Sequence, residues 1–235
     1  VFHCMLQFVA YQQVRNGTRI RFYYIDLDPN KFDNEINNIL NELDKKITPY
    51  SSDYEITKIV YDYLASTVKA DLDAYNKYLQ ITDLNNYNQV DNFLRNNGSS
   101  FSAYGPLVNK RGACMGLALA FKLLLEKYSV ESCVLAVSKN DIPHAINVVE
   151  IDGKMAYVDI TEGLIVEGLD FVLYNYFLVS ERIIKKICVF ESDLTCDDET
   201  LSYFYNKELV NEERKNIFIG IIIGIVLIIF TEFIL

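Results

Sequence analysis

Residues 112–125 read GACMGLALAFKLLL and place Cys114 at the start of an apolar pattern. The apolar residues that follow recur three and four positions apart, which is the spacing of one face of an α-helix. They are Leu117, Ala118, Phe121, Leu124, Leu125 and Tyr128. Cys114 lies on the same stripe, at its N-terminal end. We therefore expect a helix that begins near this cysteine and packs its apolar face against a core.

The start of a helix is a favourable place for a nucleophilic thiol. The positive end of the helix dipole favours the thiolate form of a cysteine. The first backbone N–H groups of a helix also lack partners within the helix, so they can hold the oxyanion of a reacting carbonyl. Gly112 and Gly116 flank Cys114 and leave room for a close backbone approach. This setting indicates a reactive role for Cys114.

A hairpin follows the helix. The dipeptide Asp-Gly at positions 152–153 separates two apolar runs, residues 144–150 and 154–160. Asp-Gly between such runs is a strong signal for a two-residue turn. In that register His144 and Asp159 lie on the same face as diagonal neighbours, roughly 7–8 Å apart at the backbone. A carboxylate and an imidazole can meet across that gap, although a β-bulge in either strand would change the register.

The chain contains two histidines, His3 and His144. We assign no function to His3, and a lone histidine in a strand is ordinarily structural. The registered partners Cys114 and Asp159 favour a catalytic His144 instead. The order Cys, His, Asp on a helix start and two strands predicts a thiol triad.

Three segments of the chain resemble one known family. They are Cys114-Met115-Gly116-Leu117-Ala118, His144-Ala145-Ile146-Asn147 and Tyr157-Val158-Asp159-Ile160-Thr161. Together they resemble the transglutaminase-like superfamily, the bacterial branch of the papain-like cysteine enzymes. The resemblance extends over residues 50–187. It departs from the family where Trp is frequent after His-Ala and after the final Thr, because this chain has Ile146 and Glu162 there and contains no Trp.

The resemblance implies an α+β, papain-like fold in which the nucleophile helix packs on an antiparallel sheet. It implies that Cys114 attacks an amide of a protein or peptide and forms a thioester, with His144 as base and Asp159 as its orienting partner. Hydrolysis of the peptidase or amidase type is the expected outcome. Transglutamination, in which an amine resolves the thioester, is one alternative. The other is a catalytically weak or inactive binding module, which the missing tryptophans suggest. No cofactor is implied.

Composition excludes several classes of protein. The 235 residues are 51% hydrophobic and 23% charged, which is typical of a globular chain with one core of ordinary size. A net charge of -10 argues against nucleic acid as a partner. Five cysteines without a Cys-x-x-Cys pair, and two histidines, predict no metal site. We expect Cys133 to be a small buried residue of a strand, and we leave open whether Cys188 and Cys196 form a disulfide.

The chain divides into four predicted parts. Residues 1–49 form an N-terminal extension of a strand and a helix, residues 50–190 the catalytic domain, residues 191–216 a linker and residues 217–235 a transmembrane helix. Within this scheme we expect helices over 31–43 and, after a cap at Ser51-Ser52-Asp53, over 53–64. Residues 71–97 are expected to form loose helices over the cleft. Their tyrosines, Tyr75 and Tyr78 among them, are either packing residues or substrate contacts.

An apolar run from Ile217 to Phe230, extended to Leu235, approaches the length of about 20 residues that spans a bilayer. We therefore expect a single-pass C-terminal membrane anchor. Gly220 and Gly224 permit close pairing of two such helices, which suggests a dimer. Basic residues at 214–215 precede the run and none follows it, which favours a catalytic domain on the cytoplasmic side. The chain begins with Val rather than Met, which suggests a fragment or a processed form.

Overall fold

The structure is a computed structural model that describes residues 6–14, 17–24, 27–81, 86–165, 171–205 and 207. Its first half contains β1 (Leu6–Val14), β2 (Gly17–Tyr24), α2 (Pro29–Leu43), α3 (Asp53–Thr67), β3 (Lys69–Ala70), α4 (Leu72–Leu79) and α5 (Tyr87–Asn97). The helical turns η1 (Gly98–Phe101) and η2 (Gly105–Asn109) follow, and then β4 (Arg111–Gly112) and α6 (Cys114–Lys127). The second half contains β5 (Ser132–Lys139), β6 (Ile142–Ile151), β7 (Lys154–Val158), the turn η3 (Ile160–Gly163) and α7 (Glu181–Ile184).

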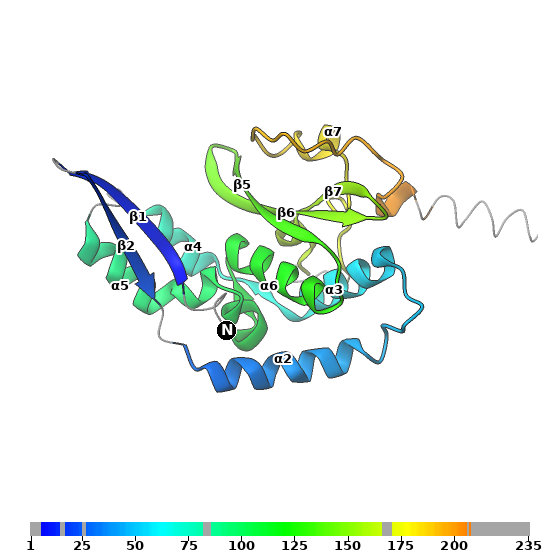
Figure 1. Ribbon diagram of the computed structural model, residues 1–235, viewed down its shortest axis with the longest axis horizontal. Helices are drawn as coiled ribbons and strands as arrows, with labels where there is room; N and C mark the ends of the chain where they lie inside the picture. The colour runs from blue at the N-terminus through cyan, green and yellow to red at the C-terminus, as the bar shows by residue number, and fades with distance from the viewer. Residues whose placement is uncertain are drawn as a thin grey trace, which may run out of the picture.

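The molecule is a mixed α+β fold with a small antiparallel sheet in the order β5-β6-β7. In Figure 1 the sheet lies on one side of α6 and α3, and α2 lies on the other. The side chains of Leu117, Phe121, Leu124 and Leu125 on α6 are completely buried. The expected helix at Cys114 and its packing on an antiparallel sheet are therefore present.

The hairpin between β6 and β7 has the expected register. Ile151 pairs with Lys154, and the ladder continues to the pair Asn147 and Val158. The turn residues Asp152 and Gly153 have φ of 51° and 75°, the left-handed conformation that a two-residue hairpin of type I′ requires. The strand β7 ends at Val158, so Asp159 lies just beyond the ladder, at the start of η3.

A second tight hairpin joins β5 to β6. Its turn residues, Asn140 and Asp141, have φ of 52° and 61°. Lys139 therefore pairs with Ile142, and two residues further back Val137 pairs with His144. Because side chains alternate along strands, Lys139 and His144 lie on the same face of the sheet.

The expectation for Cys133 is wrong, because its side chain is exposed. It lies on β5, the outer strand of the sheet, and lines a wide depression of about 520 Å³ together with Glu131, Glu150 and Met155. The open depression leaves the thiol in contact with solvent. Cys188 and Cys196 are both buried beside the sheet and both are free thiols.

The helices that precede the site begin at clear capping residues. Asp28 accepts hydrogen bonds from the N–H groups of Asn30 and Lys31 at the start of α2. Ser52 and Glu55 form a capping box at the start of α3, which confirms the predicted cap. Such caps each stabilise a helix by about 1 kcal/mol.

The main core includes residues from several of the predicted parts. Ile39 of α2, Leu64 of α3, Phe121 of α6 and Leu201 of the segment after the sheet belong to one buried cluster. In the segment after the sheet, Val179 pairs with Tyr157 in a single bridge. The boundaries at 49, 190 and 216 stay predictions.

No helix in the described ranges is long and apolar enough to cross a membrane. The predicted anchor over 217–235, and the basic residues at 214–215, lie outside those ranges.

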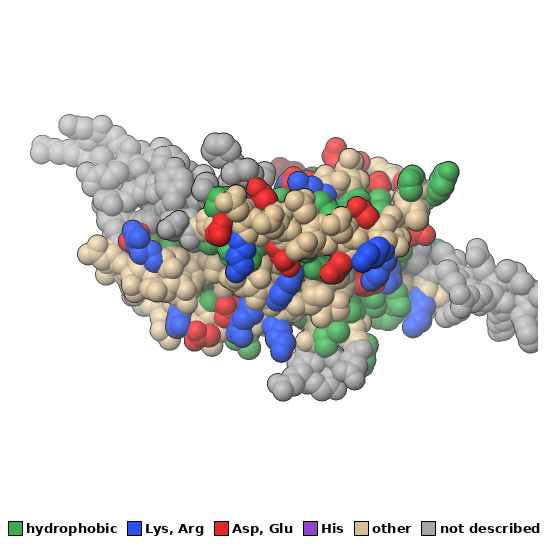
Figure 2. All heavy atoms as spheres, turned by 90° about the horizontal axis from the view of Figure 1, so that it is seen from below, with side chains coloured by type: hydrophobic (Ala, Val, Ile, Leu, Met, Phe, Trp, Pro, Cys, Tyr) green, Lys and Arg blue, Asp and Glu red, His purple; other side chains and the backbone are tan. Residues whose placement is uncertain are grey.

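Figure 2 shows acidic and basic side chains interspersed over the face of the molecule on the side of α2. The absence of a nucleic-acid partner stays a prediction.

Candidate active site

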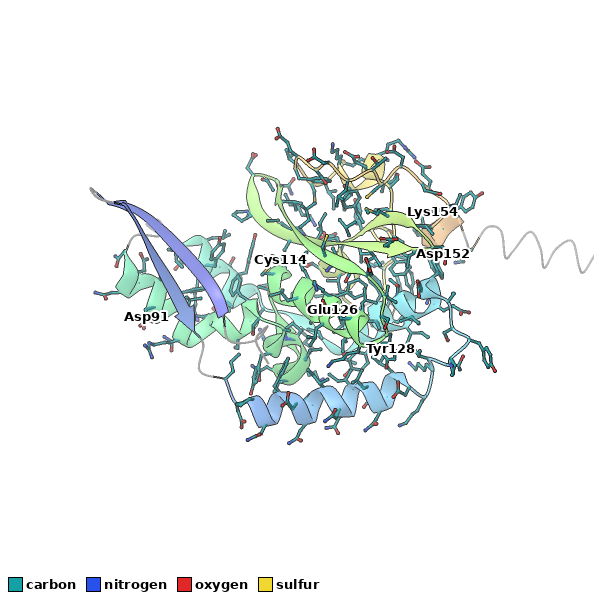
Figure 3. The ribbon with its side chains drawn as sticks, in the orientation of Figure 1. Asp91, Cys114, Glu126, Tyr128, Asp152 and Lys154 are labelled. Carbon is teal, nitrogen blue, oxygen red and sulfur yellow. The ribbon has the colours of Figure 1, made fainter. Side chains whose placement is uncertain are left out.

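Cys114 is the first residue of α6, and its position is fixed by the turn η1. The N–H of Ala113, the residue before the helix, donates to the carbonyl oxygen of Ser100 at 2.8 Å. One turn into the helix, a Cβ added at Gly116 would lie 2.3 Å from that same oxygen, so only glycine permits this approach. The half-buried Cys114 thus stands where α6 meets the sheet, as its label in Figure 3 shows.

His144 and Asp159 meet as the register predicts. The Nε2 atom of His144 lies 2.8 Å from Oδ2 of Asp159, and their side chains are 7% and 0% exposed. The other carboxylate oxygen of Asp159 accepts a hydrogen bond from the N–H of Thr161 at 3.1 Å. The carboxylate is therefore held at the start of η3 and points toward the imidazole.

The charges in this group support one another. Burial alone would raise the pKa of Asp159, but the hydrogen bond and the charge of His144, with the charge of Lys139, hold it below its ordinary value. Burial would lower the pKa of His144, yet hydrogen bonds and charges from Asp159 and Cys114 raise it from 6.5 to about 9. His144 is thus protonated at neutral pH and interacts with both the thiol and the carboxylate.

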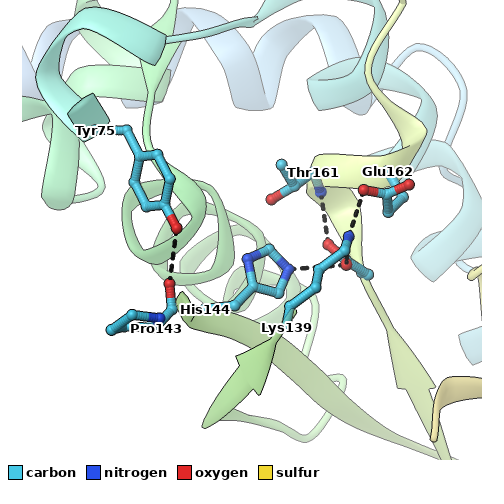
Figure 4. A network of polar contacts seen from close by, with 7 residues as sticks. Tyr75, Lys139, Pro143, His144, Thr161 and Glu162 are labelled. Carbon is cyan, nitrogen blue, oxygen red and sulfur yellow. Dashed lines mark hydrogen bonds and ion pairs between the residues drawn. The ribbon is translucent and has the colours of Figure 1, made fainter. Parts of the chain in front are cut away.

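Lys139 is the fourth member of the group. Its Nζ lies 3.3 Å from Oδ2 of Asp159 and also forms an ion pair with Glu162. Figure 4 shows the lysine reaching over the carboxylate beside the imidazole. The sequence patterns that single out Cys114, His144 and Asp159 do not single out Lys139. The signal was the Asn140-Asp141 turn, whose two residues tolerate positive φ and which places Lys139 and His144 on one face.

Asn147 ties the histidine strand to the cysteine helix. This completely buried side chain donates from Nδ2 to the carbonyl oxygen of Ala118 at 3.0 Å. Ala118 lies one turn after Cys114, and Asn147 lies three residues after His144. A hydrogen bond at this place restricts sliding of β6 along α6 and so keeps the thiol and the imidazole in reach.

Two cavities open on either side of the cysteine and histidine. The first, of about 260 Å³, is lined mainly by apolar side chains, and the second, of about 210 Å³, includes Asp71, Lys139 and Thr161. Cys114, His144 and Tyr75 line both cavities. The Tyr75 hydroxyl donates to the carbonyl oxygen of Pro143 at 3.0 Å and so connects α4 to β6, as Figure 4 shows.

In the described ranges, no group of three or more His, Cys, Asp or Glu side chains is placed to hold a metal ion. Of the three residues predicted from the sequence, Cys114 and His144 line both cavities, and Asp159 is hydrogen-bonded to His144 behind them. Their side chains place a thiol, an imidazole and a carboxylate in this part of the molecule. Tyr75 and Tyr78 line the first cavity, so they are placed to touch a substrate.

Comparisons with known proteins give little beyond this geometry. No protein-family model and no curated protein matches the chain. Among solved structures, one described as the "Crystal structure of a TGase" is similar, with a TM-score of 0.38 and 18% sequence identity. The similarity covers 72% of this chain and 47% of that one, so the chain spans about half the length of the solved protein.

Proposed function

We propose that the protein is a transglutaminase-like cysteine enzyme that acts on an amide bond of a protein or peptide through a thioester. The observation that carries the proposal is the position of His144 between a thiol and a buried carboxylate. Its pKa of about 9 keeps a proton available beside the thiol at neutral pH. Such a pairing is the usual way in which a cysteine becomes nucleophilic.

The proposed reaction has two halves. Cys114 sulfur attacks the carbonyl carbon, and a carbon–sulfur bond forms while the carbon–nitrogen bond breaks. His144 gives its proton to the departing amine nitrogen, which leaves a thioester. In the second half His144 takes a proton from water as the water oxygen attacks, and the thiolate is released with the acid. Because Nε2 of His144 faces Asp159, Nδ1 is the atom that carries the proton.

The oxyanion formed in each half requires hydrogen-bond donors. The N–H of Cys114 is the first in α6, so the helix itself supplies no carbonyl for it. Its position next to the sulfur makes it the proposed donor to the oxyanion. A donor of this kind typically contributes a factor of about 10²–10³ to the rate.

Hydrolysis is the proposed outcome, because water needs no second binding site, whereas transglutamination requires a bound amine acceptor. An inactive binding module is a weaker candidate. A buried carboxylate such as Asp159 costs free energy to keep unless it is paired, and a module without turnover has no need of the pair. The missing tryptophans that suggested such a module do not affect the triad.

The decisive experiment measures iodoacetamide labelling of Cys114 against pH by peptide mass spectrometry, in wild type and in His144→Ala. The proposal expects fast labelling below pH 7 that the substitution abolishes. The exposed Cys133 in the same chain is an internal control, and its labelling should not respond to His144→Ala. Slow labelling of Cys114 that is identical in both proteins would overturn the enzyme proposal and favour the binding module.

We also propose the single-pass anchor over residues 217–235, with the catalytic domain on the cytoplasmic side and pairing through Gly220 and Gly224. The apolar sequence and the preceding basic residues support it. Deletion of 217–235 should release the protein into the soluble fraction. Continued membrane fractionation of the deletion variant would contradict the anchor, and unchanged mobility of a Gly220→Leu variant in cross-linking would contradict the dimer.

A further inference from the structure

The apolar cavity beside Cys114 is built by a small cluster of its own. Tyr78, Phe93 and Phe101 have ring centroids 5.4 to 6.1 Å apart, and Val90 and Leu94 are buried in the same cluster. The cluster is separate from the two other groups of buried apolar residues in the described ranges. It forms one wall of the cavity with side chains that come from α4, α5 and η1.

The opposite wall is part of the catalytic strands. Ala136 and Val137 of β5, and Pro143 and Ala145 of β6, line it around His144. The thiol and the imidazole therefore belong to the lining of this cavity. A substrate can place one of its groups in the cavity while its reacting carbonyl lies next to Cys114. Its volume of about 260 Å³ exceeds that of a cavity of about 150 Å³ that holds benzene.

The second cavity is also lined largely by apolar side chains, such as Ala70, Leu72 and Ile142, but charged and polar groups stand among them. It contains the charged side chains of Asp71 and Lys139 and the polar Asn140 and Thr161. The buried hydroxyl oxygen of Thr161 has no hydrogen-bond partner among the described residues. This side suits the polar backbone of a peptide, whereas the first cavity offers few hydrogen bonds to a polar group.

We propose that the apolar cavity binds a large apolar group of the substrate, aromatic or branched aliphatic, a few bonds from the carbonyl that Cys114 attacks. The inference rests on the proposed function and names its substrate class. A carboxamide or charged group of equal size would lose its hydrogen bonds to water on entering this cavity. The apolar wall therefore selects amides next to bulky apolar side chains over amides next to polar ones.

The test uses two alkylating reagents with the same reactive group. One is N-(2-phenylethyl)iodoacetamide and the other carries a carboxamide in place of the phenyl ring. We expect the phenyl reagent to label Cys114 at least tenfold faster, while both reagents label the exposed Cys133 at equal rates. A ratio within twofold at Cys114 would overturn the proposal.

Two variants locate the effect. Ala136→Phe places a ring at an exposed position that lines the apolar cavity, and it should reduce the ratio at Cys114 to near one. Ile81→Asn makes the lining more polar and should reduce the ratio several-fold. Val189→Phe adds the same ring at a position that is 73% exposed and lines neither cavity, so the ratio should not change. An unchanged ratio in both cavity variants would also overturn the proposal.

Plain iodoacetamide separates this inference from the proposed function. Its labelling of Cys114 in each variant reports whether the site is intact, because the reagent has no group to fill the cavity. Fast, His144-dependent labelling without a preference for the phenyl reagent would remove the apolar site and leave the enzyme. Slow labelling that does not depend on His144 would remove the enzyme proposal itself.

Discussion

The two sides of Cys114 are built in different ways. The charged side consists of Lys139, His144, Asp159 and Glu162, which all lie on two consecutive hairpins and the turn that follows them. The apolar side consists of Tyr78, Phe93 and Phe101 with the neighbouring β-strands, and its aromatic residues come from three separate elements.

This difference assigns different roles to the two sides. The charged side holds a proton next to the thiol, so changes there should alter the reaction of Cys114 with every reagent. Apart from Cys114 and His144, the residues that line the apolar cavity carry no carboxyl, amino or imidazole group, so changes to them should alter only the preference between reagents. Substitutions on each side test that division.

The largest effect is expected for Asp159→Asn. It removes the hydrogen bond and charge that raise the pKa of His144 toward 9. Each unit lost lowers about tenfold the ratio of the thiolate–imidazolium form of the pair to its neutral thiol–imidazole form. Labelling of Cys114 by iodoacetamide at pH 6 should fall about a hundredfold. Removing one partner of a buried pair should also lower the free energy of unfolding by about 3–5 kcal/mol.

The matched control for this variant is Asp91→Asn. Asp91 forms an ion pair with Arg95 on the surface of α5, away from Cys114 as Figure 3 shows. Exposed pairs of this kind contribute about 0–1 kcal/mol, so neither labelling nor stability should change appreciably. Equal labelling rates in Asp159→Asn and wild type would contradict the assigned role of the charged side.

The pH dependence of stability gives the next effect. In the folded protein the pKa of His144 is about 9 against an ordinary value of 6.5, so the folded state binds this proton more tightly. The stabilisation is complete below pH 6.5 and is lost as the pH rises to 9, a change of about 3 kcal/mol. Urea denaturation of wild type and His144→Gln across this range should show their difference in stability shrinking. Parallel profiles would contradict the raised pKa.

The charged side could be predicted largely from the sequence, whereas the apolar side could not. The helix at Cys114, the hairpin register and the meeting of His144 with Asp159 all follow from local patterns: apolar spacing, one Asp-Gly turn and side-chain alternation. The position of Lys139 also depends on a local pattern, the Asn140-Asp141 turn, but that dipeptide is a weaker turn signal than Asp-Gly.

No local sequence pattern of this kind marks the residues of the apolar side. Residues 71–97 are rich in Asn and Asp, and their few aromatic residues become a wall only when α4, α5 and η1 meet. Packing between separate elements decides that arrangement, and a single sequence does not encode it as a period. The predicted burial of Cys133 was wrong for a related reason, because the depression beside β5 is formed by several separate chain segments.

Lys139→Met tests whether the lysine positions the charged side. Its charge helps to lower the pKa of Asp159, so removing it should let Asp159 take up a proton at a higher pH. The acid limb of the Cys114 labelling profile should then move to higher pH. Lys139→Arg should restore the limb, because the charge returns. A limb that does not move in Lys139→Met would limit the lysine to a purely structural role.

The smallest effect is expected for Tyr75→Phe, which breaks the link between the two sides. The variant loses one solvent-exposed hydrogen bond to the Pro143 carbonyl and should lower the free energy of unfolding by about 0.5 kcal/mol. The ring remains between the cavities, so the preference of Cys114 for the phenyl reagent should change by less than twofold. Tyr75→Ala removes the ring as well, which joins the apolar cavity to the second cavity, and it should reduce the preference clearly. If Tyr75→Phe alone abolished the preference, the hydroxyl rather than the aromatic wall would control selection, and the two sides would act as one.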